Sequence, residues 1–339
     1  MSSENRAAQR RALTQGLSGA IPLVVYQWEA WDGFMIDTLA PHAIVREASP
    51  TEDVVKLLDS LPSTPGVFLF HLNVSITESF PLQRHDLIAG LHERGWITCN
   101  EQVTDISKQA IQARLMSAGC RSVLGHEDGS ADELMIIKSN YNYGGEGERK
   151  LPEAIRSRLG IEDLPSSGLE YATSRRDEIP GEAWRDPSLT IERFVGNKRG
   201  HYCRAWIAGE RTHLIQLSCP DEIKTVGGSQ LVGLWNARFD SASTLPDPIA
   251  DGAMTEVIRG SNALALDFGA IDVMLNEAGE PFIVDVNTTP WGRLHTGWEV
   301  SGFPDYVHHL SAGSAKALSR SKSLLRPLRI LLHSLASRS

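Results

Sequence analysis

Asp285 and Asn287 are two oxygen-bearing side chains at the end of an apolar run that reads PFIVDVN. Alternate side chains of a strand share a face, so both are predicted to emerge on one side, together with Ile283. A hairpin centred on residues 278 and 279 would set Asp272 directly opposite Asp285, although a bulge at the turn would move the register by one. The pattern therefore predicts three oxygen donors in one small patch.

Two carboxylates this close repel each other, and the pKa of each would rise unless a cation neutralised them. Mg²⁺ suits such a patch because it prefers hard oxygen ligands, keeps several waters and is commonly shared with substrate phosphates. Either aspartate alone would more simply cap or solvate the end of a strand. Because the two are expected on facing strands beside an amide, we predict a metal site with three ligands: Asp272, Asp285 and Asn287.

Phosphate groups need further cationic and backbone donors. Lys138 ends the apolar run LMIIK and precedes a loop in which Gly144 and Gly145 would let backbone N–H groups approach an anion closely. A glycine-rich turn or a lysine at a strand edge is by itself a common structural feature. Their adjacency, with Lys108 on an earlier predicted helix, favours a clamp for a triphosphate.

The elements that must position these side chains begin with an α/β alternation. Apolar runs predict strands at 21–28, 67–73 and 96–99, and helical spacing predicts helices at 53–61 and 86–95. This order is typical of a small parallel α/β layer. No GxGxxG follows the first strand, which argues against a site for a nicotinamide dinucleotide.

A second region is predicted to begin with a helix that Thr104 or Asp105 caps and Gly119 ends. Further along, the patterns predict strands at 133–138 and 188–195, a hairpin over 201–217 that turns at residues 208 and 209, a helix over 254–266 and a hairpin over 269–287.

Composition places the chain among ordinary soluble globular proteins, with 339 residues, 41% of them hydrophobic and 22% charged. This length predicts two or three lobes that share a cleft. A net charge of −9 gives no general attraction to nucleic acid or to an anionic membrane. The four cysteines lack CxxC spacing and no run is long enough to span a membrane, so we expect reduced thiols, no membrane span and a cytoplasmic protein.

The segment after residue 310 is basic, with no acidic side chain, and leucines alternate with its lysines and arginines. The simpler interpretation is a terminal helix on the acidic body, interrupted at Pro327. A weak membrane or partner anchor is the alternative, which Pro327 disfavours because it breaks the amphipathic face.

Taken in order, the segments DISK, IIKSNYNYGGEGE, TIERFV, RGHYCRAW, AIDVML and IVDVN resemble the ATP-grasp superfamily over roughly residues 100 to 300. The resemblance implies a parallel α/β domain over 1–103 (a pre-ATP-grasp domain), followed over 104–310 by a two-lobed ATP-grasp fold of the α+β type. The lid lobe would span about 132–198 and the metal-binding lobe about 199–310, with 311–339 as a basic C-terminal tail.

The resemblance also implies that ATP and Mg²⁺ bind between the two lobes. Lys108 and Lys138 match lysines that contact phosphates, and Gly144 and Gly145 match the loop that folds over them. Glu192 matches the acidic residue at the adenine. The remaining matches are the backbone of Phe194 and Val195 for the base, the magnesium ligands Asp272, Asp285 and Asn287, and Arg204, which faces the phosphoryl group in flight.

Two positions depart from the pattern of the superfamily. It usually has glutamate where this chain has Asp285, and the shorter side chain changes the reach to a metal without removing the charge. The acid that often binds the ribose hydroxyls, a few residues after the base-binding segment, has no counterpart in VGNKRGH. Ribose recognition is therefore left unassigned.

The acceptor substrate is expected where the first domain meets the metal-binding lobe, because ligands of α/β sheets gather at the carboxyl ends of strands. Arg293 lies six residues beyond Asn287 and is suited to a two-pronged grip on a substrate carboxylate, so we count it with Lys138 and Arg204 as catalytic. The other candidates each have a structural alternative, as packing or core groups: Gln27, Trp28, Trp31, His71, Asn73 and His295.

Most enzymes of the superfamily phosphorylate a carboxylate to an acyl phosphate, which an amine or another nucleophile then attacks. Our first hypothesis is therefore an ADP-forming carboxylate–amine ligase with small-molecule substrates. A kinase for a small alcohol and a nucleotide-sensing module without turnover are the alternatives. Dimerisation is common among similar proteins, so the resemblance also leaves a homodimer open.

Overall fold

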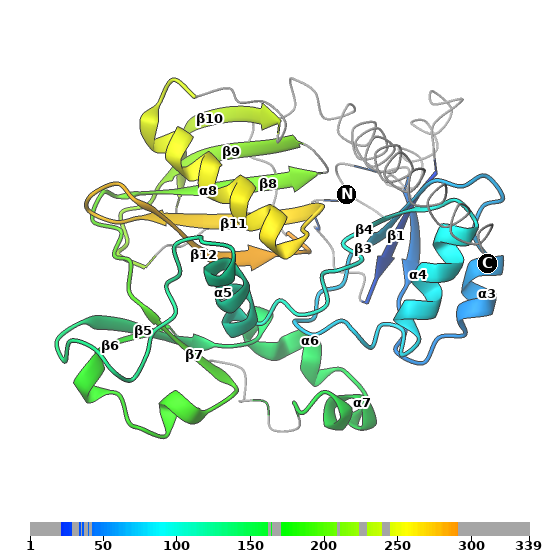
Figure 1. The fold of residues 1–339 in the computed structure, drawn as a ribbon, viewed down its shortest axis with the longest axis horizontal. Coiled ribbons are helices and arrows are strands. Elements are labelled where there is room, and N and C mark those ends of the chain that lie inside the picture. Colours follow the sequence, from blue (N-terminus) through cyan, green and yellow to red (C-terminus); the bar gives the residue numbers. More distant parts are fainter. Residues whose placement is uncertain are drawn as a thin grey trace, which may run out of the picture.

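The computed structural model describes residues 22–28, 34, 36, 40, 43–161, 164, 171–208, 211–223, 229–238 and 245–290. Within these ranges the chain forms a parallel sheet of four strands and two antiparallel sheets, of three and five strands (Figure 1). This arrangement confirms the predicted fold class, in which a parallel α/β region precedes two lobes that each carry an antiparallel sheet.

The N-terminal sheet has the strand order β2-β1-β3-β4, and all its neighbours are parallel. The predicted alternation of strands and helices is confirmed. Strand β2 was not expected, because IVRE is a short, partly exposed edge strand with little hydrophobic periodicity. The elements are β1 (Leu23–Gln27), β2 (Ile44–Glu47), α3 (Val54–Asp59), β3 (Val67–Phe70), α4 (Arg84–Glu93) and β4 (Ile97–Cys99).

The second region begins with α5 (Lys108–Ser117). The predicted caps are wrong, because Ser107 occupies the N-cap position and Asp105 accepts a hydrogen bond from its backbone N–H at 2.8 Å. Gly119 ends the helix as predicted, with a left-handed φ of +75°. The later start places Lys108 in the first turn of the helix.

The three-stranded sheet has the order β6-β5-β7 and carries the glycine-rich segment after its central strand. Its elements are β5 (Leu134–Ser139), the short helices η1 (Asn142–Gly145), α6 (Glu146–Arg149) and α7 (Glu153–Arg158), β6 (Ala172–Arg175), η2 (Arg176–Glu178), η3 (Ala183–Arg185) and β7 (Leu189–Arg193).

The five-stranded sheet has the order β10-β9-β8-β11-β12. Helix α8 was expected from residue 254, but it begins at Pro248 because Asp247 caps it, accepting from two backbone N–H groups at 2.8 and 3.1 Å. Strand β10 was not expected. The elements are β8 (His201–Ala208), β9 (Arg211–Ser218), β10 (Gln230–Arg238), α8 (Pro248–Leu264), β11 (Phe268–Leu275) and β12 (Pro281–Asn287).

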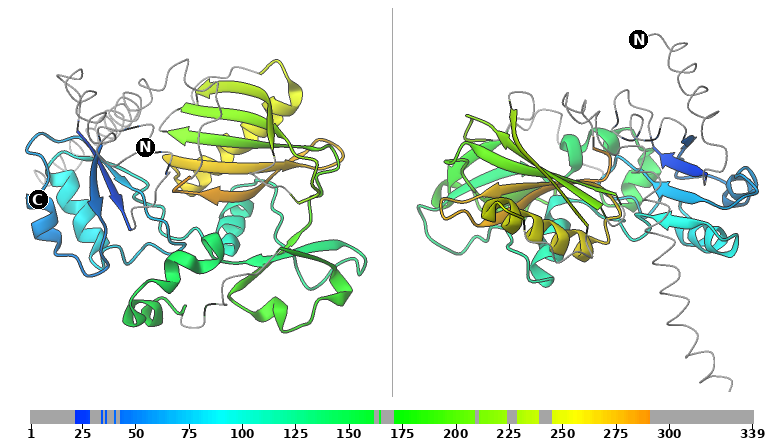
Figure 2. Two further views of the ribbon diagram at one scale, coloured as in Figure 1. Left: turned by 180° about the vertical axis from the view of Figure 1, so that it is seen from behind. Right: turned by 90° about the horizontal axis from the view of Figure 1, so that it is seen from above.

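Helices α5 and α8 cover one face of the five-stranded sheet (Figure 2), and the other face contributes to a second hydrophobic core. One face buries Ile271 and Val286 against α5 and α8, and the other packs Trp206 and Met274 in a core shared with β1 and β3. This shared core holds the N-terminal sheet beside the five-stranded sheet. The domain boundary at 103/104 stays a prediction, which falls in the connection between β4 and α5.

Candidate active site

Asp272 and Asp285 are direct partners across the hairpin of β11 and β12, as predicted. Two departures from the expected hairpin cancel. The turn centres on residue 278 and not between 278 and 279, since Leu275 pairs with Pro281 where Phe282 was expected, and a bulge at Val284 then restores the predicted pairing. The bulge also makes one expectation wrong, because Ile283 packs with α8 on the face opposite Asp285.

Arg204 on β8 extends this pair into a row across three neighbouring strands. It is the cross-strand partner of Asp272, and its Nε lies 3.6 Å from Asp272 Oδ1. Burial alone would lower the pKa of Arg204, but the carboxylates of Asp272 and Asp285 outweigh it and raise that pKa. Arg204 and Asp272 are not among the residues that line the two hollows described below.

Lys108 reaches the same row from the first turn of α5. Its Nζ lies 3.1 Å from Asp285 Oδ1, and its side chain is 10% exposed. Burial would lower the pKa of Lys108, but Asp285, Tyr171 and Glu192 together raise it. Each carboxylate of the pair is therefore balanced by one buried cation.

Lys138 and Glu192 form a second buried ion pair, between β5 and β7. Their Nζ–Oε2 distance is 2.5 Å, and the side chains are 10% and 1% exposed. The other oxygen of Glu192, Oε1, is buried and has no hydrogen-bond partner. The sequence placed Lys138 at the phosphates and Glu192 at the base, and the structure shows that the two are in direct contact.

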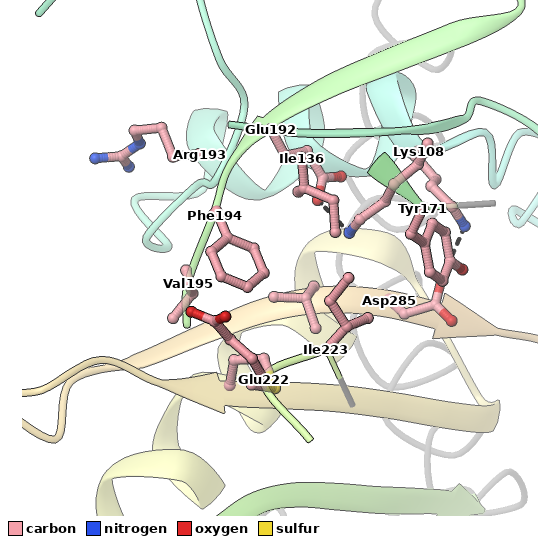
Figure 3. Close-up of a pocket in the computed structure, with 13 residues that line it drawn as sticks. Lys108, Ile136, Tyr171, Glu192, Arg193, Phe194, Val195, Glu222, Ile223 and Asp285 are labelled. Atoms are coloured by element: carbon pink, nitrogen blue, oxygen red, sulfur yellow. Dashed lines mark hydrogen bonds and ion pairs between the residues drawn. The ribbon is translucent and has the colours of Figure 1, made fainter. Parts of the chain in front are cut away.

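Two hollows meet at Lys108, Tyr171 and Asp285. The first measures about 530 Å³ and is shown in Figure 3, with Lys108 and Asp285 at one end and Val195 and Glu222 at the other. Its middle is apolar, and Arg193 points away from it (Figure 3). The apolar walls come from Ile136, Phe194, Val195, Ile223, Met274 and Val284.

The second hollow measures about 610 Å³ and extends from the shared residues to the glycine-rich segment. Asn287 and Gly144 line it, whereas Gly145 is not among its lining residues. Asn142 also lines it, with a buried Nδ2 that has no hydrogen-bond partner. The first hollow is thus an apolar slot, and it continues into the second hollow, which is lined by a lysine, a carboxylate and backbone.

The glycine loop, residues 142–148, is wound in an uncommon way. Tyr143, Gly144 and Gly145 all have left-handed backbone, with φ of +47°, +64° and +79°. Gly147 lies so close to the N-terminal domain that a Cβ there would come within 2.6 Å of the Asn73 carbonyl oxygen. The loop therefore needs glycine at its bend and at its contact with that domain.

Asn287 is held on both sides of its amide. Its Nδ2 donates to the Tyr143 hydroxyl at 2.8 Å, and its Oδ1 accepts from the Thr289 backbone N–H at 2.8 Å. The side chain is thereby fixed at the junction of β12 and the glycine loop.

The predicted acceptor residues are only partly described. Gln27 ends β1, and His71 and Asn73 follow β3; all three are at most 3% exposed, and each has at least one side-chain polar atom with no hydrogen-bond partner. Burial lowers the pKa of His71 to about 3, so its imidazole is neutral near pH 7. Trp28 packs edge-on against Phe80, 5.2 Å between ring centroids. Outside the described residues lie Trp31, Arg293, His295 and the tail 311–339.

The donor set fits a hard divalent cation. Over the residues that the structure describes, no three His, Cys, Asp or Glu side chains gather as a metal site, so the candidate ligands are two carboxylates and one amide oxygen. Such a set leaves positions for water and for phosphate oxygens, as Mg²⁺ requires. Zinc would call for more nitrogen or sulfur ligands.

Glu222 and Ile223 are site residues that the sequence analysis missed. They follow β9 and reach the first hollow from the five-stranded sheet (Figure 3). The only sequence signal is an acid two residues after Pro220, in a segment without periodicity.

No protein-family profile and no curated protein match the sequence. Solved structures do match. The ATP-grasp ligase PsnB, complexed with a phosphomimetic variant of a minimal precursor, Mg and ADP, is 12% identical, with a TM-score of 0.46 and coverage of 87% of this chain and 99% of that one.

Two further matches are similar in extent. The D-alanine–D-alanine ligase from Bacillus anthracis is 11% identical, with a TM-score of 0.43 and coverage of 91% and 100%. The macrocyclase MdnC from Microcystis aeruginosa MRC, bound with precursor peptide MdnA, is 10% identical, with a TM-score of 0.45 and coverage of 85% and 98%. Several structures similar to this chain are ATP-grasp ligases, as the sequence resemblance predicted, and at this identity the likeness concerns the fold.

Among the described helices, none is long and apolar enough to cross a membrane.

Proposed function

We propose that the protein is an ATP-dependent ligase that activates a carboxylate as an acyl phosphate and joins it to an amine, releasing ADP and phosphate. One observation carries this proposal. Asp285, balanced by Lys108, lies where an apolar slot opens into a polar hollow lined by the glycine loop, and its cross-strand partner Asp272 is balanced by Arg204 on the next strand.

The slot and the hollow together suit a nucleotide. The base would lie between Phe194 and Ile223, and the phosphates would extend past Lys108 and Lys138 toward Gly144. Glu222, at the other end of the slot, lies beyond the base and offers a carboxylate that accepts from its exocyclic amine, and the role that VGNKRGH leaves open stays unassigned. The base and the phosphates of ATP thus meet groups of matching chemistry.

Each aspartate of the facing pair is neutralised by one buried cation, Asp272 by Arg204 and Asp285 by Lys108. Mg²⁺ would be held by Asp272, Asp285 and Asn287, and the lysine and arginine that now neutralise the aspartates would turn to phosphate oxygens. Mg²⁺ alone would leave two buried cations uncompensated, and ATP alone would leave two carboxylates. The metal and the nucleotide are therefore expected to bind together, far better than either alone.

In the reaction, a substrate carboxylate oxygen attacks the γ-phosphorus of ATP, and the bond from that phosphorus to the bridging oxygen breaks. ADP and an acyl phosphate form. The amine then attacks the acyl carbon, a proton leaves the nitrogen, and inorganic phosphate departs. Bound Mg²⁺ supplies charge neutralisation on the phosphate oxygens.

The chain's own residues stabilise the charge that develops on the phosphoryl oxygens. Lys138 and Arg204 are the proposed donors, and a well-placed donor of this kind lowers a barrier by about 2.7 to 4 kcal/mol. The docked glycine loop excludes water that would hydrolyse the acyl phosphate. Arg293 is proposed to hold the substrate carboxylate by its guanidinium.

The test is a screen for ADP release over pairs of carboxylates and amines with Mg²⁺, using Asp285→Ala as the blank. ADP and phosphate that appear only with both substrates support a ligase. A stable phosphorylated acceptor would instead identify a kinase. Binding of ATP without ADP formation from any pair would identify a sensing module, and activity that survives in the blank would remove Asp285 from the metal site.

A further inference from the structure

Tyr143 is the one residue of the left-handed bend in the glycine loop that is not glycine. A non-glycine residue in this conformation costs about 1 to 2 kcal/mol, and such residues persist where the surrounding structure holds them. The contact that holds Tyr143 includes the hydrogen bond from Asn287 Nδ2 to its hydroxyl. A strained residue of the loop is thus bonded directly to a proposed metal ligand.

The glycine loop is also tied to the N-terminal domain. The backbone N–H of Asn142 donates to Ser75 Oγ at 2.7 Å, and the backbone N–H of Ser75 donates to Glu148 Oε1 at 2.5 Å. Asn142, Ser75 and Glu148 are all buried. Both ends of the loop therefore rest on one short segment that follows β3.

The end of β12 completes a junction of three segments. Thr288, next to Asn287, donates its hydroxyl to the backbone carbonyl of Leu72 at 3.0 Å. Segments 72–75, 142–148 and 287–289 are thus each hydrogen-bonded to the other two. A displacement of the glycine loop would break its bonds to Ser75 and to Asn287 together.

Asn287 is the member of this junction that would touch the metal. Its Oδ1 already accepts from Thr289, and the Tyr143 hydroxyl accepts from its Nδ2, so the amide has a single orientation. Without the hydroxyl, the amide would lose the bond that holds its Nδ2 and keep those from the Thr289 backbone N–H and hydroxyl to its Oδ1, so the metal ligand would be less well placed.

We propose that Tyr143 is a positioning residue that couples docking of the glycine loop to the orientation of the metal ligand Asn287. This coupling rests on the proposed function, because it needs Mg²⁺ and ATP to bind at this site. Its consequence is that the loop and the metal site become ordered in one step.

The test is Tyr143→Phe, which removes only the hydroxyl. Two quantities are measured: hydrogen exchange of amides 142–148 in the free protein, and affinity for Mn²⁺ in the presence of AMP-PNP by electron paramagnetic resonance. Loss of one hydrogen bond predicts exchange about 3 to 10 times faster and Mn²⁺ affinity lower by a similar factor. Tyr26→Phe is the matched control, since it removes a hydroxyl bonded to Glu52 in the N-terminal domain, and both quantities should stay unchanged.

Faster exchange with unchanged Mn²⁺ affinity would overturn the coupling and leave a purely structural contact. Weaker Mn²⁺ binding with unchanged exchange, or no change in either, would overturn it as well. Failure of the wild-type protein to bind Mn²⁺ with AMP-PNP would refute the proposed function and the coupling together, which distinguishes it from a failure of the coupling alone.

Discussion

The buried pair of Lys138 and Glu192 gives the sharpest prediction. The pair as a whole is expected to add nothing to the free energy of unfolding, whereas Lys138 is expected to be needed for nucleotide binding. The two side chains are 10% and 1% exposed and 2.5 Å apart. Removing one partner of such a pair leaves a buried charge and typically costs about 3 to 5 kcal/mol. Replacing both partners with apolar side chains of similar size is often neutral or stabilising.

The perturbations are Lys138→Met, Glu192→Leu and the double variant. Each single variant should lower the free energy of unfolding by up to about 3 to 5 kcal/mol, with the smaller loss where the remaining group can change its protonation. The double variant should be less destabilised than either single variant. Unfolding in urea, with the slope checked for constancy, measures all three differences.

Nucleotide affinity, measured by calorimetry with AMP-PNP and Mg²⁺, should depend on whether Lys138 is present and not on stability, so Lys138→Met and the double variant should both lose it. The double variant lacks the phosphate-binding cation, so it should lose nucleotide binding although its stability is restored. A double variant as unstable as the single ones would show that the pair stabilises the fold in its own right. Binding of AMP-PNP to the double variant with wild-type affinity would refute the role of Lys138.

Three further predictions address the glycine loop, the buried carboxyl of Asp267 and the base-binding end of the slot. Gly147→Ala would place a Cβ 2.6 Å from the Asn73 carbonyl oxygen, so it should undock the glycine loop at a cost of about 1 to 3 kcal/mol. Faster hydrogen exchange of amides 142–148 would show the undocking, and unchanged exchange would contradict the close contact. The control is Gly252→Ala in α8, which has open space around it and should stabilise the chain slightly. Burial raises the pKa of Asp267 to about 6, against the Asn100 backbone N–H that lowers it, so the folded state binds more protons than the unfolded one between about pH 4 and 6. The free energy of unfolding should therefore fall as pH rises through that window, by up to about 3 kcal/mol, and Asp267→Asn should flatten this slope in urea unfolding; an unchanged slope would assign it to other groups. Glu222→Gln should weaken ATP binding about tenfold but leave inosine triphosphate, which lacks the exocyclic amine, less affected in calorimetry, whereas equal losses for both nucleotides would remove Glu222 from the base.

Much of the hairpin of β11 and β12 could be predicted, because strand alternation limits the registers that it can adopt. The predicted pairing of Asp272 with Asp285 is correct because the turn shifts the register by one residue and the bulge at Val284 shifts it back. Nothing in the sequence of β12 distinguishes a bulge at Val284 from a regular strand, so the face of Ile283 could not be predicted. The start of α8 was predictable in principle from Asp247 and Pro248.

Other site features depend on contacts between distant segments. The contact of Lys138 with Glu192 requires the register between β5 and β7, and the docking of Tyr143 on Asn287 requires the placement of three separate segments. Glu222 reaches the slot from a connection without periodic pattern. Single-sequence patterns carry little information about such contacts, because they report local periodicity rather than tertiary position.

The central claim is that the facing aspartates hold a divalent ion that bridges to bound ATP. Calorimetric titration of AMP-PNP, with and without Mg²⁺, into the wild-type protein and Asp285→Asn tests it most directly. We predict tight binding to the wild type only when Mg²⁺ is present, and loss of that Mg²⁺ dependence in the variant. Equal affinity with and without Mg²⁺ in the wild type, or an unchanged Mg²⁺ dependence in Asp285→Asn, would contradict the claim.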